Sequence, residues 1–311
     1  MRYVVRKTLY LIPVLIAVSF FTFLLLDLLP GGPEVAILGA SASEENRAEV
    51  REELNLDRPL PVRYVEWVGN AATGDLGNSF ITKQAVTSQI GERLGNTMFL
   101  LIYAQFLALA VGIPLGILAA QRPGGWTDRL ASGSAFAFLA VPSFVLAYVL
   151  SYLFGYQLEW FPTLFKADAR LWSLFLPAVS LAAAEAAVYL RILRSDMVST
   201  LQEDYIAMAK AKGLSRSRIL MRHAFRPSTF TLVTIAGLNM ARLIGGAFVI
   251  ERIFSINGIG RLAIDSVLKR DYLVVQGVVL VVAVGYVLFN LAIDILYAYL
   301  DPRIRHARAL A

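Results

Sequence analysis

The chain contains six apolar runs of about 20 residues, and these constrain its fold more than any other feature. A run of this length crosses the roughly 30 Å hydrocarbon core of a bilayer as one α-helix. Hydrophobic residues make up 57% of the 311 residues and charged residues only 17%, against roughly 25% in soluble domains. We therefore predict an all-α integral membrane protein with six transmembrane helices. The runs lie near Thr8–Leu29, Asn96–Ala120, Leu130–Gly155, Trp172–Arg191, Thr229–Ile250 and Gln276–Leu300.

Basic residues gather on alternate connections between these runs, which predicts the topology. Because loops rich in Lys and Arg stay in the cytoplasm, we expect the protein to lie in the cytoplasmic (inner) membrane with both termini inside. The first run is too long for a cleaved signal peptide, so we expect it to be retained. The basic residues assigned to the cytoplasm are Arg2, Arg6, Lys7, Arg122, Arg129, Arg191, Arg194, Lys210, Lys212, Arg216, Arg218, Arg222, Arg226, Arg303, Arg305 and Arg308.

The same topology divides the chain into three parts. Residues 1–29 form the N-terminus and first transmembrane helix, residues 30–95 an extracytoplasmic cap rich in carboxylates, and residues 96–311 the transmembrane domain. The cap is too short to hold a separate solute-binding domain. A cytoplasmic loop over 192–228 belongs to the third part.

The 192–228 loop has the sequence signals of two helices joined by a tight turn. Thr200 and Glu203 have capping-box spacing, which predicts a helix from about Leu201. Gly213 suits a left-handed residue that ends it, and Ser215 could cap a second short helix over Arg216–Ala224. An ordered basic loop on one face of a membrane protein indicates contact with a partner.

Four ionisable residues fall within or near the apolar runs. Asp27 and Asp294 lie near run ends, where they can reach the headgroups. Glu185 and Arg242 lie deeper, where an isolated charge costs about 2.5–3.5 kcal/mol. They should face protein or a water-filled path, and both an ion pair between them and a role in translocation remain open.

Prolines and small residues inside the runs predict local geometry. Each proline removes a backbone donor and should kink its helix. Small residues spaced four apart let helix backbones approach closely, within the chain or against a homologous partner. The prolines are Pro114, Pro142 and Pro177, and the small residues are Gly112, Gly116, Gly237, Ala241 and Gly245.

No reacting constellation characteristic of an enzyme is present. The sequence has no cysteine, only two histidines (His223 and His306), and neither an HExxH nor a GxSxG motif. It also lacks a phosphate-binding Gly-x4-Gly-Lys-Ser/Thr loop. We expect no catalytic residue, metal or cofactor in this chain, and if ATP drives its activity another chain must bind it. The net charge of +6 reports topology and not nucleic-acid binding.

Motifs along nearly the whole chain resemble one known family, the inner-membrane permease subunits of ABC importers in the dipeptide/oligopeptide/nickel permease B branch. Together they form a strong signal, although each alone would be weak. They are Leu28-Leu29-Pro30-Gly31, Glu53-Leu54-Asn55-Leu56-Asp57-Arg58-Pro59-Leu60-Pro61-Val62-Arg63-Tyr64, Gly74-Asp75-Leu76-Gly77-Asn78-Ser79, Val141-Pro142-Ser143-Phe144, Arg191-Ile192-Leu193-Arg194, Asp204-Tyr205, Ala209-Lys210-Ala211-Lys212-Gly213-Leu214-Ser215 and Asp301-Pro302-Arg303.

The resemblance implies that the 192–228 loop carries an EAA motif, a coupling helix that docks onto an ATPase subunit. Ala207-Met208-Ala209 stands at the EAA triplet without its Glu, and Pro227 falls one place later than in the general pattern. Other departures are Asn55 for Gly, Asn257 for Pro, and Arg242 for an apolar or small residue. The residues implied in ATPase coupling are Tyr205, Ala207, Ala209, Lys210, Lys212, Gly213, Leu214 and Arg216.

The resemblance further implies a type I ABC importer transmembrane domain that forms half of a path for di- or oligopeptides by alternating access. Its partners would be a second homologous permease, two ATPase subunits that hold ATP and Mg²⁺, and a solute-binding protein. Candidates for the path or gate are Glu185, Asn239, Arg242, Gly245 and Gly246, and candidates for contact with the binding protein are Asp57, Arg58, Asp75 and Asn78.

The alternative is a self-sufficient secondary transporter that couples to protons through Glu185 or Asp294. It lacks the internal repeat that many such carriers show, and it does not explain the ordered basic loop. Within the resembling branch, glutathione-like compounds, nickel chelates and haem remain alternative cargoes.

Overall fold

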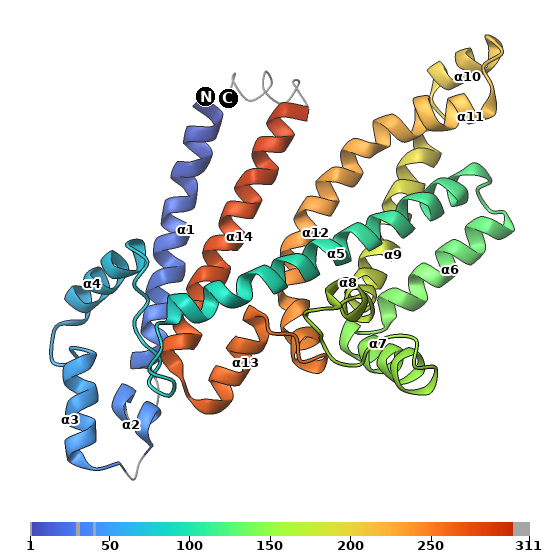
Figure 1. The fold of residues 1–311 in the computed structure, drawn as a ribbon. Coiled ribbons are helices and arrows are strands. Elements are labelled where there is room, and N and C mark those ends of the chain that lie inside the picture. The colour runs from blue at the N-terminus through green and yellow to red at the C-terminus, as the bar shows by residue number, and fades with distance from the viewer. Residues whose placement is uncertain (1, 29–31, 40–41, 301–311) are drawn as a thin grey trace. The chain divides into compact units, whose positions relative to one another are not determined.

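The computed structural model describes residues 2–28, 32–39 and 42–300. In this part of the chain all regular secondary structure is helical, apart from the isolated bridge between Asn78 and Ala85. The elements, drawn in Figure 1, are α1 (Arg2–Asp27), α2 (Gly32–Leu38), α3 (Glu44–Glu53), α4 (Leu60–Ala72), α5 (Val86–Gln121), α6 (Trp126–Ala140), α7 (Ser143–Leu150), η1 (Ser151–Gln157), α8 (Arg170–Ser173), α9 (Phe175–Thr200), α10 (Asp204–Ala211), α11 (Arg216–Arg218), η2 (Ile219–Phe225), α12 (Arg226–Ile253), α13 (Ile259–Lys269) and α14 (Tyr272–Leu300).

The prediction of an all-α fold is confirmed for these residues. They form two compact units, 1–95 with 257–291 and 96–256 with 292–311. Each unit is described by itself below.

Some of the six predicted transmembrane helices are found in the structure when helices are judged by length and apolar composition. Among the described residues they are α5, α9 and Tyr272–Ile293 of α14. Two bent pairs would raise the number to five if each counts as one span. The apolar part of α1, Leu11–Asp27, is shorter than this length criterion. The count of six therefore stays a prediction.

Proline acts differently in each predicted span. Pro142 separates α6 from α7, whose axes differ by 100°. Val141 before it is extended, at φ −91° and ψ 120°, because the proline ring disfavours the helical conformation of the preceding residue. The bend predicted at Pro142 is therefore present, as a break between two helices. Helix α5 continues through Pro114, and Pro177 lies in the first turn of α9, where its missing N–H costs no helical bond.

Helix α9 is the centre of the second unit, and α6, α7 and α12 pack on it. Gly112 lets α5 approach it closely: a Cβ there would lie 2.9 Å from both the Ala186 carbonyl and the Tyr189 Cβ. Gly116 does the same opposite Leu193. Tyr189 and Leu193 are fully buried. The small-residue spacing in α5 thus serves packing within this chain, one of the two alternatives that the sequence left open.

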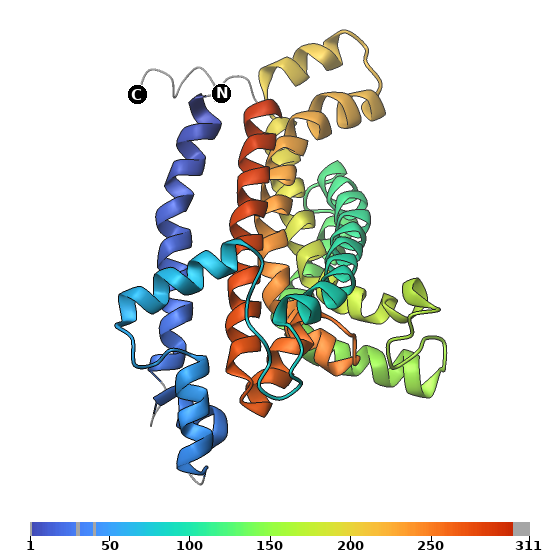
Figure 2. The same cartoon turned by 60° about the vertical axis from the view of Figure 1, so that its left-hand side comes forward.

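In the first unit, α4 lies against α1 (Figure 2). Phe23 of α1 contacts the rings of Tyr64 and Trp67 with centroids 5.7 Å away in each case. Arg63 of α4 pairs with Asp27 at 3.0 Å, and both side chains are largely buried. Asp27 is therefore a packing residue at the end of its helix.

The segment between α4 and α5 packs against α14. Ser79, which is fully buried, donates a hydrogen bond of 2.5 Å to Asp271 just before α14. A Cβ at Gly277 would lie 2.5 Å from a Val86 methyl carbon, so only glycine allows this approach.

Candidate functional site

The 192–228 loop begins as the last turns of α9, and a turn at 201–203 stands where a helix start was predicted. Helix α9 continues to Thr200, and the carbonyls of Ser199 and Thr200 accept turn bonds from Gln202 and Glu203 at 3.0 and 3.2 Å. Glu203 then occupies the N-cap position of α10. The predicted capping box at Thr200 is wrong because Thr200 is itself helical and cannot act as an N-cap.

The tight turn after α10 follows the prediction. Gly213 has φ +73°, in the left-handed region, and a Cβ there would meet nothing within 4 Å. The glycine is therefore required by the backbone conformation and not by space. The Ser215 hydroxyl accepts a hydrogen bond from the Arg218 amide at 3.4 Å, which confirms it as an N-cap.

The second helix of the loop does not stop at Ala224. Elements α11, η2 and α12 follow one another without a break, so the predicted separate short helix is wrong. Pro227 lacks the N–H that an α-helix would donate to the His223 carbonyl. Tyr205 of α10 donates to that carbonyl at 2.9 Å. Partial burial and the Glu203 carboxylate raise the pKa of Tyr205, so its hydroxyl keeps the proton that this bond needs.

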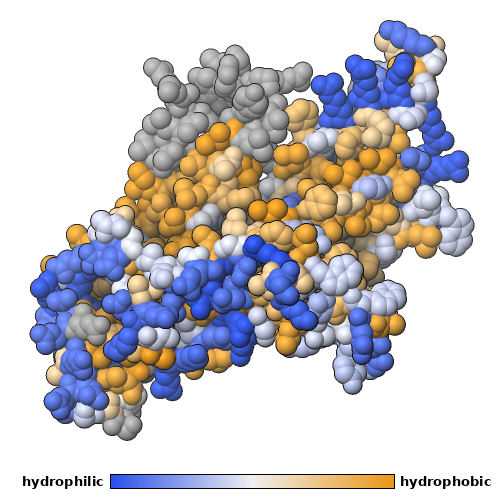
Figure 3. All heavy atoms as spheres, in the orientation of Figure 1, coloured by the Kyte–Doolittle hydropathy of each residue, from blue (hydrophilic) through white to orange (hydrophobic). Residues whose placement is uncertain are grey.

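The loop has a buried apolar face and an exposed basic one. Ile206, Ala209 and Ile219 form a small core on which Leu214 packs. Ala209 and Leu214 therefore hold the loop together, and they are the inward-facing members of the predicted coupling set. Figure 3 shows hydrophilic residues over α10 and α11 next to the apolar surface of the long helices. The other predicted coupling residues are exposed: Tyr205, Ala207, Lys210, Lys212, Gly213 and Arg216.

Two arginines tie this region to the turn between α5 and α6. Arg216 donates to the carbonyl of Gln121, the last residue of α5, at 2.5 Å. A cation is favourable there because the C-terminus of a helix carries partial negative charge. Arg194 near the end of α9 binds Asp128 in the first turn of α6. The 192–228 loop and the α5–α6 turn are thus held together at two points.

Asp128 is the residue at this junction that the sequence reasoning missed. Its two oxygens accept from Nε and an Nη of Arg194 at 2.8 and 2.7 Å, and also from the Gly124 amide and the Ser132 hydroxyl. A signal was available, because an acidic residue in the first turn after Gly124-Gly125 complements a helix N-terminus. Its distant partner could not be read from that pattern.

Glu185 and Arg242 also meet, but loosely. An Nη of Arg242 lies 3.7 Å from Glu185 Oε1; the Glu185 side chain is 6% exposed and that of Arg242 is 67% exposed. Asn239 is buried beside them in α12. Glu185 Oε2 and Asn239 Nδ2 have no hydrogen-bond partner among the described residues. Gly246 packs on Leu181 of α9, and Gly245 faces open space.

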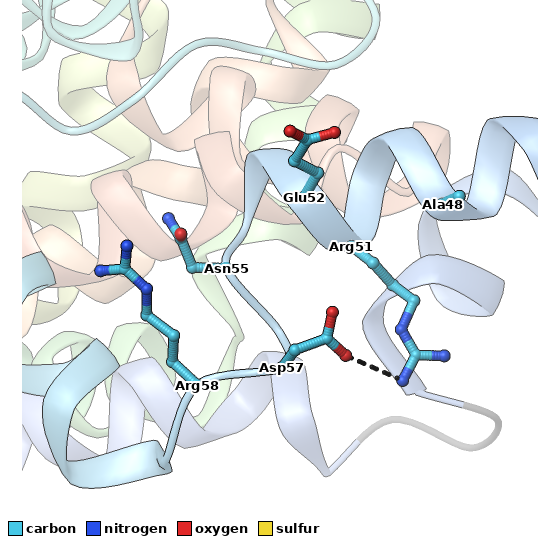
Figure 4. Close-up of a pocket in the computed structure, with 6 residues that line it drawn as sticks. All are labelled: Ala48, Arg51, Glu52, Asn55, Asp57 and Arg58. Carbon is cyan, nitrogen blue, oxygen red and sulfur yellow. Dashed lines mark ion pairs between the residues drawn. The ribbon is translucent and has the colours of Figure 1, made fainter.

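The predicted contacts for a binding protein lie on exposed turns of the cap segment, residues 30–95. Asn55 ends α3 with φ +51°, a conformation that Asn tolerates nearly as well as Gly. This explains Asn in place of the glycine implied by the resemblance. Figure 4 shows the pocket of about 400 Å³ beside it, where Asp57 pairs with Arg51 at 3.4 Å and Arg58 lines the opposite wall. Asp75 and Asn78 are exposed in the segment before α5.

Several predictions concern residues outside the described part of the chain. They are the Leu29-Pro30-Gly31 portion of the first motif, the motif Asp301-Pro302-Arg303, and the side chain of Asp294. Among the described residues, no group of three or more His, Cys, Asp or Glu side chains could hold a metal ion.

Two family models match the chain. Residues 1–101 match the N-terminal part of the membrane component of binding-protein-dependent transport systems, and residues 112–306 match the inner membrane component of these systems. The chain belongs to this family of ABC importer permeases, which are membrane subunits of transport systems.

Proteins of similar sequence share nearly the full length. A probable peptide ABC transporter permease, y4tP of Sinorhizobium fredii, is 39% identical over 311 residues, covering 98% of this chain and 99% of the relative. The glutathione transport system permease GsiC of Pectobacterium atrosepticum is 38% identical over 306 residues with the same coverage. GsiC of Escherichia coli K12 is 37% identical over 307 residues.

A solved structure shows the same fold. A chain of the MetNI methionine ABC transporter in inward-facing conformations superposes with a TM-score of 0.58 at 16% identity. The match covers 68% of this chain and 96% of that one. The predicted type I ABC importer transmembrane fold is confirmed.

Proposed function

We propose that this chain forms half of the membrane path of an ATP-driven importer of small peptides. The observation that carries the proposal is similarity over 98% of the chain to permeases named for peptide and glutathione transport. A second homologous permease would form the other half. Two ATPase subunits would supply ATP hydrolysis with Mg²⁺, and a solute-binding protein would deliver the cargo.

The exposed face of α10 is the proposed ATPase contact, and the basic loops and both termini would lie in the cytoplasm. Lys210 on this face, with Lys212 and Arg216 just beyond the helix, presents positive charge. Ile206 and Ala209 pack the helix against the rest of the loop. Movement of the loop would pass to α5 and α6 through Arg216 and Arg194, which bind their ends. This gives alternating access a mechanical route within one unit of the chain.

Reconstitution tests the proposed function directly. The permease pair, its ATPases and the binding protein should take up the peptides carried by that binding protein into vesicles. With the binding protein added outside, uptake should require ATP enclosed in the vesicle, on the ATPase side. Uptake driven by a proton gradient without ATP would contradict the proposal and favour a secondary transporter.

Gly213→Val tests the coupling role of the loop. A β-branched residue cannot adopt φ +73° without strain, so the turn after α10 should reorganise. We expect uptake to fall about five- to thirtyfold, because roughly 1–2 kcal/mol of backbone strain opposes the docked loop. Gly213→Asn is the matched control, since Asn tolerates this conformation, and it should keep most uptake. If both variants keep the uptake rate of the parent protein, the turn at Gly213 is not needed for coupling to the ATPases.

The cap segment is proposed to meet the binding protein. Asp57 and Arg58 are exposed at the pocket between α3 and α4. The paired charge reversals Asp57→Lys and Arg58→Glu should weaken stimulation of the ATPases by the loaded binding protein while leaving basal ATPase activity unchanged. Unchanged stimulation would assign the cap a purely structural role.

A further inference from the structure

A polar cluster on α9 and α12 has unused hydrogen-bonding capacity. Arg242 lies on a face of α12 that also exposes Leu238, Gly245 and Val249. Beneath it, Glu185 Oε2 and Asn239 Nδ2 are buried without a hydrogen-bond partner among the described residues. Burial puts these two atoms beyond the reach of a ligand, so the exposed Arg242 guanidinium is the accessible polar group of the cluster.

The position of the cluster excludes a simple lipid-facing role. At 1.5 Å per residue, Arg242 lies about 24 Å along α12 from Arg226 and about 17 Å from Ile253. A guanidinium at such depth is costly in hydrocarbon and normally faces protein or a water-filled path. Its distance of 3.7 Å to Glu185 exceeds ordinary hydrogen-bond range. The guanidinium therefore keeps its N–H donors available for another acceptor.

The charges of the cluster define the ligand. The exposed guanidinium of Arg242 favours an anion, whereas the buried Glu185 carboxylate 3.7 Å away opposes a doubly charged one such as phosphate. A carboxylate beside an N–H group fits better, because the planar guanidinium can bind both carboxylate oxygens while Glu185 disfavours a second negative charge. Space for this group exists at Gly245, one helical turn from Arg242, where a Cβ would meet nothing within 4 Å.

We propose that Arg242 binds the carboxyl-terminal carboxylate of a peptide as it passes through the membrane domain. This rests on the proposed function and adds a specificity-determining contact within the permease, separate from the binding protein. Arg242 touches the cargo. Glu185 is a positioning residue that holds the guanidinium over the open face, and Asn239 completes the polar surface around it.

Binding without the binding protein tests this proposal. The complete permease–ATPase complex in lipid nanodiscs is titrated with trialanine or with trialanine amide, and saturation-transfer NMR, which detects weak binding, reports each Kd. The parent complex should bind the free acid about 10- to 100-fold more tightly than the amide, the range expected for charge-assisted hydrogen bonds. Arg242→Gln should bring the two affinities within about twofold of each other, since the variant loses the charged donor pair.

Two further variants keep the test decisive. Arg242→Lys retains the positive charge but not the planar guanidinium, so it should keep only part of the preference for the free acid over the amide. This variant replaces Arg242→Gln in the test if Arg242→Gln does not assemble into the complex. Leu238→Ala, on the same exposed face, is the matched control and should keep the full preference for the free acid. No preference in the parent complex, or a full preference in Arg242→Gln, would overturn the assignment. ATP-driven uptake by the same parent complex, measured with the binding protein, shows separately whether the proposed import function holds.

Discussion

Helix α9 takes part in two arginine–carboxylate pairs of very different construction. Near its end, Arg194 binds Asp128 through two hydrogen bonds of 2.7 and 2.8 Å. In its middle, Glu185 meets Arg242 at only 3.7 Å, with 67% of the arginine side chain exposed. The first pair is closed and its carboxylate is fully bonded; the second is open, with a carboxylate oxygen left unpaired.

The contrast separates a structural pair from the pair that we propose binds cargo. Buried polar groups stabilise a fold when their hydrogen bonds are complete. Asp128 meets this condition with partners from α9, from the α5–α6 turn and from its own helix. Glu185 does not, so its pair with Arg242 contributes little to stability and remains available for a ligand. The predictions below test this division.

Removal of Asp128 should have the largest effect. Asp128→Ala leaves Arg194 and the Gly124 amide without their acceptor, and we expect a loss of about 3 kcal/mol in the free energy of unfolding, at the lower end for a broken buried pair because Arg194 is partly exposed. Denaturant titration of the purified complex measures it. Asp128→Asn retains the shape and one acceptor, so it should cost clearly less. If the free energy of unfolding of Asp128→Ala falls by less than about 1 kcal/mol, the Asp128–Arg194 pair is not an important structural contact.

Double-mutant cycles should differ between the two pairs. The Asp128→Ala and Arg194→Ala cycle should give a coupling energy of about 2 kcal/mol, as expected for a hydrogen-bonded pair in contact. The Glu185→Leu and Arg242→Leu cycle should give less than about 1 kcal/mol, because the arginine is exposed and the pair is loose. Equal coupling energies in the two cycles would mean that the open pair is structural after all.

Ser132→Ala should have the smallest effect. The Ser132 hydroxyl donates to Asp128 at 3.2 Å, and the carboxylate keeps three other donors, so we expect a loss of about 0.5–1 kcal/mol. The same titration series measures it beside Asp128→Ala. A loss as large as that of the alanine variant would show that the hydroxyl, and not the arginine, holds Asp128 in place.

The 192–228 loop shows which parts of a site local sequence can predict. Gly213 and Ser215 act within a few residues of themselves, and their turn and cap were predicted correctly. The start of the first helix was not, because α9 extends to Thr200. The hydrogen bond from Tyr205 to the His223 carbonyl joins two helices, and no local rule indicates which carbonyl a tyrosine will reach.

The sequence by itself determined the membrane class and the helical fold, while the division into a cap and a membrane domain and the coupling residues stay predictions. These follow from the length of apolar runs, from caps and from motifs, all of which act over short stretches of chain. Only the tertiary structure decided that Pro142 breaks its helix by 100° and that Asp128 meets Arg194 across 66 residues. It also brought Glu185 and Arg242 together while leaving their donors and acceptors unfilled. Such pairings depend on which faces of separate helices meet, and that is settled by the packing of the whole bundle.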